Sequence, residues 1–159
     1  MIEPNDYVLV TDQTLDVGSA YSAVKNSAIN AEDPGAVVVF VGLVREFDDH
    51  LSSGRLQILR LQHYPELTEA SIAEVIAQAR ERWGLGTVLV QHRVGDLRPA
   101  DEIVVVAVTS KHRAHAFEAA RFLMDKLKTE VMLWKRVLNA DEAQWVAFKD
   151  SDAKASSAW

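Results

Sequence analysis

The clearest hydrophobic periodicity in the chain begins at Pro65 and predicts an amphipathic helix. Apolar residues at positions i, i+3, i+4, i+7 and i+11 fall on one face of an α-helix. In this segment they are Ile72, Val75, Ile76, Ala79 and Trp83. Gly84 and Gly86 follow this apolar stripe, and we expect the helix to end there.

Two further helices are predicted on either side of this one. Residues 16–30 have a weaker helical pattern, and Pro34-Gly35 punctuates the chain after them. The inward positions of this helix are expected to be Ala20, Val24 and Ile29. Ser110 is expected to cap a long helix that runs to about Glu130. Its inward positions are expected to be Phe117, Ala120, Met124 and Leu127.

The remaining apolar segments have strand patterns and are joined by polar connections. The predicted strands are residues 7–11, 36–45, 55–64, 87–94, 102–109, 131–138 and 143–148. The segment 36–45 is apolar almost throughout, which suits a strand buried on both faces. We interpret residues 46–54 as a loop, GDLRPAD at 95–101 as a turn, and 139–142 as the turn of a closing hairpin.

The predicted order is β-α-β-β-α-β-β-α-β-β, in which strands often follow one another directly. Such neighbours favour antiparallel or mixed pairing, so we predict an α+β fold rather than a doubly wound sheet. The length of 159 residues suggests one domain, at residues 1–150, with a tail at 151–159. We expect the tail to be mobile, with docking of Trp159 as the alternative.

Composition and charge exclude several classes of function. Hydrophobic residues make up 48% of the chain, enough for a core, and the formal net charge is −6. An acidic chain argues against general binding to nucleic acids or anionic membranes. Cysteine is absent, so disulfides, thiolate nucleophiles and cysteine zinc sites are excluded. The chain shows no signal peptide pattern and no apolar run of membrane-spanning length, so we expect a soluble cytoplasmic protein.

Basic residues gather at the expected start of the last long helix, in the run T-S-K-H-R at 109–113. The amino end of a helix carries the positive pole of its dipole, so cations there cost about 0.3–1 kcal/mol each. His112 and Arg113 therefore suggest an anion site, because phosphate and carboxylate groups bind well at such ends. The alternative is that these side chains point into solvent or meet nearby carboxylates.

A second basic group flanks the apolar segment around Trp134. Lys128, Lys135 and Arg136 together suggest a basic wall beside an apolar surface, where a partly desolvated lysine could act as acid, base or nucleophile. Each residue alone also fits an exposed surface position. Arg45, at the end of a predicted buried strand, is a further candidate, although a surface arginine is the commoner case.

Other chemistry is poorly supported by the sequence. His112 and His115 are spaced i, i+3 without a carboxylate ligand pattern, so we expect no metal site and no cofactor. His112 and Lys128 would lie about 24 Å apart along one helix, at 1.5 Å per residue. One small anion cannot contact both within a single chain, so we predict a homodimer in which two chains share each site.

Several long segments resemble one known family. They are GAVVVFVGLVR, LQHYPELTEASIAEV, the run from RWGLGTVLV through VTSKHRAHAFEA and LKTEVMLWKR, and the tail SDAKASSAW. They are similar to the large, catalytic subunit of molybdopterin synthase, the MoaE family, from about Gly35 onward. The resemblance implies an α/β-hammerhead-like fold with a small extra antiparallel subdomain.

The resemblance also implies an activity and partners. The family forms the dithiolene of molybdopterin from cyclic pyranopterin monophosphate (precursor Z). Sulfur arrives as a thiocarboxylate on the carboxyl-terminal Gly-Gly of a small ubiquitin-like subunit. Two large subunits form a central homodimer with a small subunit at each end, a heterotetramer. A chain without cysteine fits a reaction in which another protein brings the sulfur.

By match of motif, the resemblance assigns roles to individual residues. Lys128 and Lys135 resemble the catalytic lysines: Lys128 beside the thiocarboxylate, where it assists acyl or proton transfer, and Lys135 handling protons and charge at the pterin side chain. The positions that resemble substrate-binding residues are Arg45, His112, Arg113, Arg136, Leu43, Val44 and Val137. Phe40 and Met124 match pocket-lining positions, for which core packing is an equal alternative.

Three positions depart from the pattern of the family. Met132 stands where proline is usual, Val137 where glutamate is usual, and Leu43 where lysine or threonine is common. Two other functions remain open on the residues alone. One is a non-catalytic dimer that binds a ubiquitin-like tail or an anionic metabolite, and the other is an unrelated phosphoryl- or acyl-transfer enzyme.

Overall fold

Two β-sheets of four strands each organise the computed structural model, which describes residues 5–29, 34–147 and 150–159, with the backbone alone at 28 and 29. The strands are β1 Asp6–Thr11, β2 Ala36–Leu43, β3 Ile58–His63, β4 Val88–Arg93, β5 Gly95–Leu97, β6 Glu102–Ser110, β7 Leu133–Leu138 and β8 Ala143–Val146. The helices are α1 Val17–Ile29, α2 Pro65–Arg82, α3 Arg113–Glu130 and α4 Asp150–Ser157. The predicted α+β class is confirmed.

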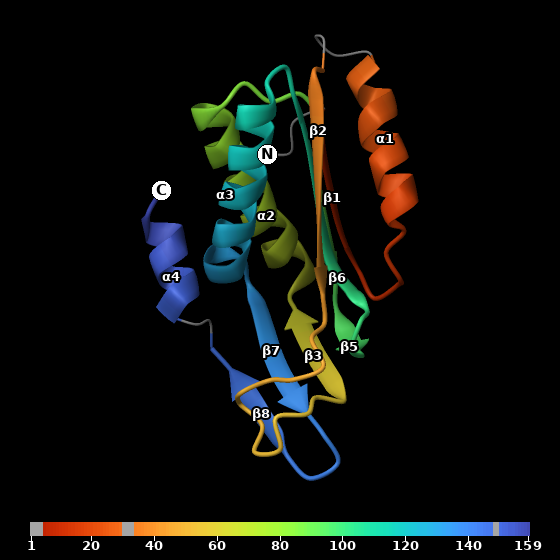
Figure 1. Ribbon diagram of the computed structural model, residues 1–159, viewed down its shortest axis with the longest axis vertical. Helices are drawn as coiled ribbons and strands as arrows, with labels where there is room; N and C mark the ends of the chain where they lie inside the picture. Colours follow the sequence, from red (N-terminus) through yellow and green to blue (C-terminus); the bar gives the residue numbers. More distant parts are fainter. Residues whose placement is uncertain (1–4, 30–33, 148–149) are drawn as a thin grey trace.

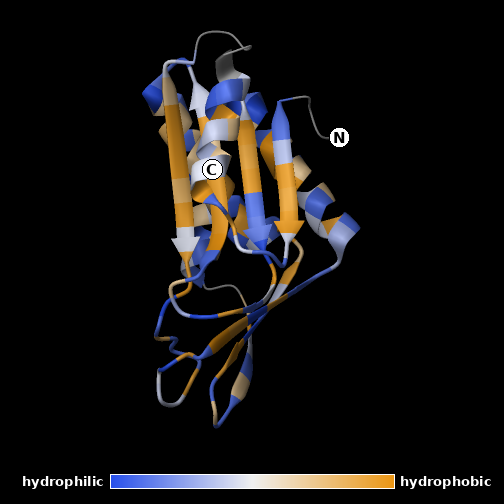
Figure 2. Ribbon diagram, turned by 90° about the vertical axis from the view of Figure 1, so that its right-hand side faces the viewer, coloured by the Kyte–Doolittle hydropathy of each residue, from blue (hydrophilic) through white to orange (hydrophobic). Residues whose placement is uncertain are grey.

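The larger sheet has the strand order β1-β4-β6-β2 and carries helices on both faces (Figure 1). β1 runs parallel to β4, whereas β6 is antiparallel to both β4 and β2. α1 lies on one face, and α2 and α3 lie side by side on the other. Side chains alternate along each strand, so the strands supply apolar residues to both layers, and Figure 2 shows them as largely hydrophobic.

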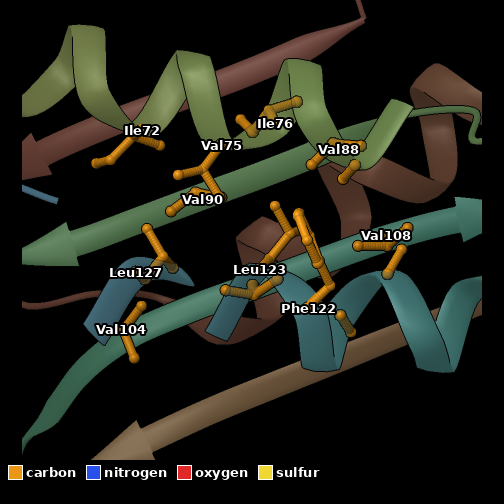
Figure 3. Close-up of a cluster of buried hydrophobic side chains, with 14 residues drawn as sticks. Ile72, Val75, Ile76, Val88, Val90, Val104, Val108, Phe122, Leu123 and Leu127 are labelled. Atoms are coloured by element: carbon orange, nitrogen blue, oxygen red, sulfur yellow. The ribbon is translucent and has the colours of Figure 1, made fainter. Parts of the chain in front are cut away.

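The principal core lies between the larger sheet and the helices α2 and α3. Phe122 of α3 and Ile72 and Ile76 of α2 are fully buried, and they face Val90 and Val108 of the sheet (Figure 3). The inward stripe predicted for α2 is confirmed, with buried side chains at Ile72, Val75, Ile76 and Ala79.

The smaller sheet has the order β5-β3-β7-β8, is antiparallel throughout, and lies beyond one end of the larger sheet (Figure 1). It is the small extra subdomain implied by the resemblance. Its inner face and the adjoining loops form a second core, made of Val44, Leu51, Leu56, Leu59, Leu61, Val94, Leu97 and Val137.

β2 differs from the prediction for residues 36–45. It is an edge strand of the larger sheet, paired only with β6 among the described strands, and its side chains are half-buried or exposed rather than fully buried. Phe40 is 42% exposed and Leu43 is 53% exposed. The apolar run reflects the two helical layers that flank the strand, and composition alone does not distinguish an edge from a central position.

The start of α3 also differs from the prediction. Ser110 is the last residue of β6, and its hydroxyl donates a hydrogen bond to the backbone oxygen of Gly84 (2.8 Å). The N-cap is His112, without a side-chain capping bond, so Lys111 lies outside the helix. Phe117, predicted to point inward, is 62% exposed, whereas Ala120 and Leu127 are buried as expected.

Two shorter elements were also mispredicted. The supposed turn at 95–101 contains β5, which pairs with β3 before the chain turns through Ala100 at φ 72°. The tail was expected to be mobile, but residues 150–157 form α4, which packs against α3 (Figure 1).

The inward positions predicted for α1 are confirmed where the structure describes them, at Ala20 and Val24. The side chain of Ile29 and the predicted strand residue Phe148 lie outside what the structure describes.

Candidate active site

Lys128 lies in the last turn of α3, just before the short link to β7. Its side chain is 56% exposed, and its Nζ is 3.5 Å from Oδ1 of Asp152 on α4. An exposed ion pair of this length contributes roughly 0–1 kcal/mol to stability. The amine is therefore held loosely and remains accessible to a ligand.

Lys135 lies on β7, on the strand face that points toward the second core. Its cross-strand neighbours are Leu61 on β3 and Val146 on β8, both apolar. The side chain is 35% exposed, and its Nζ is 3.8 Å from Oδ2 of Asp48. A carboxylate at this distance favours the protonated form of the amine, although the separation is too long for a hydrogen bond.

Asp48 is a buried carboxylate that the sequence analysis missed. Its side chain is only 6% exposed, and its Oδ1 accepts a hydrogen bond from the backbone N–H of His50 (2.9 Å) and lies 2.6 Å from the Nδ1 atom of that residue. Burial acts to raise the pKa of Asp48, but the bonds from His50 and the charge of Lys135 hold it below its usual value. The carboxylate is thus ionised beside the predicted catalytic amine.

Arg45 follows the end of β2, where the larger sheet meets the smaller one (Figure 1). The preceding residue, Val44, is fixed by two backbone hydrogen bonds: its N–H donates to the oxygen of Asp101, and its own oxygen accepts from Ala100. Val44 is 4% exposed, whereas Arg45 is exposed. The end of β2 therefore presents Arg45 to solvent on a rigid backbone.

His112 and Arg113 lie at the opposite end of α3 from Lys128. Both are exposed, and the ring of His112 packs edge-on against that of His115, with centroids 5.7 Å apart. Since α3 is one continuous helix, the structure keeps these residues a helix length from the lysines within one chain, as the sequence analysis expected. Arg45, Lys128 and Lys135 therefore belong to elements that meet where the two sheets adjoin, whereas His112 and Arg113 lie at the far end of α3.

Two of the predicted substrate-binding residues have buried side chains. Val44 and Val137, the latter fully buried, pack in the second hydrophobic cluster, so their side chains do not line an open surface of this chain. Arg136 does not join the wall expected with Lys135, because the two side chains leave β7 on opposite faces. Its guanidinium lies over the ring of Trp145, 5.4 Å from the centroid. Leu43 is exposed and sterically available.

Phe40 and Met124, the predicted pocket-lining residues, lie on the same side of the larger sheet. Phe40 shares its strand face with Val38, which packs with Met124 against the core under α2 and α3. Phe40 is 42% exposed, and Met124 is half-buried. Their positions fit both of the interpretations left open by the sequence.

Met132 shows how the chain accommodates one departure from the family pattern. Its backbone oxygen accepts a hydrogen bond from Oγ1 of Thr68 (2.7 Å), and its N–H donates to Oγ of Ser71 (3.3 Å). A proline here, as the resemblance leads us to expect, would have no N–H and could make only the first bond. The link from α3 to β7 is thus fastened to α2 by a bond that the departure makes possible.

Surface hollows occur elsewhere on the chain. One of about 460 Å³ is lined by Phe117, Glu118, Arg121, Ala158 and Trp159. Another of about 490 Å³ lies beside Glu46, Arg55 and Arg98. Within residues 5–29, 34–147 and 150–159, no three His, Cys, Asp or Glu side chains are placed to hold a metal ion. No helix of these ranges is long and apolar enough to cross a membrane.

The sequence model of the family described as MoaE protein matches residues 10–130, most of the chain. The chain belongs to the MoaE family. Over 152 residues it is 45% identical to the molybdopterin synthase catalytic subunit of Salmonella typhimurium (strain LT2), covering 96% of this chain and 97% of that protein.

Solved structures of MoaE proteins have the same fold. Molybdopterin cofactor biosynthesis protein E from Burkholderia multivorans superposes with a TM-score of 0.78 at 34% identity, over 97% of this chain and 96% of that chain. A chain in the complex of subunits 1 and 2 of molybdopterin-converting factor from Helicobacter pylori has a TM-score of 0.68 at 22% identity, over 89% of each chain. The fold and the family expected from the sequence are both confirmed.

Proposed function

We propose that this chain is the catalytic subunit of a molybdopterin synthase. The reaction transfers sulfur from the thiocarboxylate of a small ubiquitin-like subunit to cyclic pyranopterin monophosphate, which forms the molybdopterin dithiolene. The observation that carries the proposal is the near full-length similarity, at 45% identity, to a protein named as that catalytic subunit. In each transfer the donor loses its sulfur and ends as a carboxylate, with water supplying the oxygen.

The positions of the basic residues support this chemistry. The phosphate of the substrate and the thiocarboxylate of the donor are both anionic, so an acidic protein needs a local cationic site to bind them. Lys128 lies in the last turn of α3, and Lys135 lies on β7, the next element of the chain. Arg45 follows the end of β2, and the ends of β2 and α3 lie on the side of the larger sheet that adjoins the smaller one (Figure 1). We assign proton or acyl transfer at the donor to Lys128, and proton and charge handling at the pterin to Lys135.

The remaining basic residues favour a site shared between two chains. His112 and Arg113 are exposed at the far end of α3, where they are available to a neighbouring subunit. A twofold homodimer can bring this end of one subunit to the lysines of the other. We propose that such a dimer is the centre of a heterotetramer with two small subunits. A cytoplasmic location remains a prediction from the sequence.

A single-turnover assay tests the proposed function. The chain is mixed with the cyclic pterin substrate and a thiocarboxylated small subunit, and molybdopterin is measured as its fluorescent oxidation product. Formation of the dithiolene supports the proposal. Binding of both ligands without product would favour the non-catalytic module instead, and turnover without the sulfur donor would favour an unrelated transferase.

A further inference from the structure

The loop between Arg45 and β3 is fastened across the hairpin that carries Lys135. The backbone N–H and hydroxyl of Ser52 both donate hydrogen bonds to the carboxylate of Glu142, which precedes β8. Nδ2 of Asn139, in the same turn, donates to Oγ of Ser53 (3.1 Å). Leu51 is 4% exposed and anchors the loop in the second core. The loop and the β7–β8 hairpin therefore form one connected unit.

Within this loop the backbone is folded tightly around Asp48. Its N–H donates to the backbone oxygen of Gly54 (2.7 Å), and its own backbone oxygen accepts from Leu51 (3.2 Å). Gly54 has φ +73°, in the left-handed region that glycine adopts without strain. These bonds fix the backbone from which the carboxylate of Asp48 projects.

The two oxygens of the Asp48 carboxylate have different neighbours. Oδ1 faces the backbone N–H and ring of His50, and Oδ2 faces Nζ of Lys135 at 3.8 Å. Across the strands, Lys135 faces the apolar residues Leu61 and Val146. Burying an ionised carboxylate costs free energy unless a hydrogen bond or an opposite charge compensates it. The bonds from His50 and the amine of Lys135 provide this compensation for Asp48.

We propose that Asp48, oriented by His50, is a positioning residue that holds the amine of Lys135 for the sulfur-transfer reaction. This inference rests on the proposed function and on the role assigned to Lys135. At 3.8 Å the two groups attract each other as charges without a short hydrogen bond, so the amine can turn toward a substrate. The charge of Asp48 holds the amine beside this carboxylate until the substrate arrives.

Neutralising the carboxylate tests this role, with a matched control next to it in the sequence. Asp48→Asn keeps the size of the side chain and removes its charge, and Asp49→Asn makes the same change at an exposed position. In the assembled synthase we expect Asp48→Asn to lower kcat about 10- to 100-fold, the cost of a misplaced reacting group, with KM within about twofold of wild type. Asp49→Asn is expected to leave both constants unchanged.

A pH profile separates positioning from a purely structural role. Loss of the carboxylate weakens the protonated form of Lys135, so the alkaline limb of kcat should move to lower pH in Asp48→Asn but not in Asp49→Asn. Asp48→Glu restores the charge and should recover part of kcat. His50→Gln, which keeps the carboxylate and removes the ring that orients it, should lower kcat by a smaller factor and serves if Asp48→Asn does not fold.

The outcomes also separate this inference from the proposed function. If the wild-type chain forms no molybdopterin, the proposed function fails. If wild type is active and Lys135→Ala is not, but Asp48→Asn and His50→Gln retain the wild-type kcat and pH profile, the positioning role is overturned alone. A fall in kcat that simply follows a lowered melting temperature, with an unchanged pH profile, would also overturn it.

Discussion

Lys135 and Arg136 are adjacent in the sequence, yet their side chains leave β7 on opposite faces. Lys135 faces the carboxylate of Asp48, whereas the guanidinium of Arg136 lies over Trp145 on β8. Strand geometry requires this alternation, so the run W-K-R cannot form one basic wall within a chain. The two cations must therefore act differently, even if both contact substrate in an assembled dimer.

The first prediction follows from this separation. Lys135→Met should lower kcat by about two orders of magnitude or more, since proton handling by a positioned group contributes roughly that much. Arg136→Met should instead raise KM for the anionic substrate with a smaller effect on kcat, because it removes binding charge. Steady-state kinetics of the synthase with each variant measures the difference. Equal losses of kcat in both variants would contradict it.

The second prediction concerns Lys128. Lys128→Ala should nearly abolish dithiolene formation while the dimer stays folded. Its exposed ion pair with Asp152 contributes little stability, so the free energy of unfolding should change by less than about 1 kcal/mol. Lys25→Ala, at an exposed position of α1, is the matched control and should retain full activity. Wild-type turnover by Lys128→Ala in the single-turnover assay would refute the assignment.

The sequence predicted elements well where periodicity and burial agree, as in α2, where Ile72, Val75 and Ile76 are all buried. It failed where an apolar residue is exposed, because hydropathy does not report what covers a side chain. Phe117 occupies a helical position consistent with the core but is 62% exposed. β5 was missed because three residues carry too little pattern to separate a strand from a turn.

The candidate site was predicted in part. The lysines were selected from the charge pattern and the resemblance; the structure puts them on the consecutive elements α3 and β7, and their catalytic roles stay predictions. The opposite faces of Lys135 and Arg136 follow from a strand that was itself predicted, so alternation could have been applied to them. Asp48 could not be selected from the polar loop EFDDHLSSG, because the sequence does not show how the loop folds: Leu51 enters the second core and Ser52 is bonded to Glu142 of the β7–β8 turn.

The third prediction concerns Trp159, whose side chain docks at the edge of the principal core. The ring of Trp159 packs edge-on against Trp83 (5.6 Å) and Phe122 (5.5 Å), and its Nε1 donates a hydrogen bond to Oδ2 of Asp125 (2.8 Å). Trp159→Ala should therefore lower the free energy of unfolding by about 2–4 kcal/mol, since it removes aromatic packing at the edge of the core. Chemical denaturation monitored by circular dichroism measures the change.

A second tryptophan provides the control for this prediction. Trp145 is 58% exposed on β8, and its contact with Arg136 lies at the surface of the smaller sheet. Trp145→Ala should change stability by less than about 1 kcal/mol. If the two substitutions cost the same, the docking of Trp159 does not stabilise α4 on α3.

The fourth prediction is a pH dependence of stability that arises from His92 on β4. The side chain is 8% exposed, and its Nδ1 is 2.9 Å from the backbone oxygen of Arg93, to which the neutral ring can donate. Burial lowers the pKa of His92 below its usual 6.5, the bond to Arg93 opposes this, and the nearby charge of His63 adds to the lowering. In the folded chain the ring therefore stays neutral at a pH where the unfolded chain protonates it.

The sign of the effect follows from proton linkage. Between the lowered folded pKa and the unfolded value near 6.5, the unfolded chain binds a proton that the folded chain does not, so the free energy of unfolding rises with pH. The contribution is complete above about pH 6.5 and declines as the pH falls below it. Asp48 and Asp96, whose pKa values lie below the usual 3.8, act in a more acidic range. Urea denaturation between pH 5 and 7.5 should show a free energy of unfolding that rises with pH, with a slope that His92→Gln flattens. His115→Gln, at a half-buried position of α3, should leave the slope unchanged, and equal slopes in all three proteins would contradict the assignment.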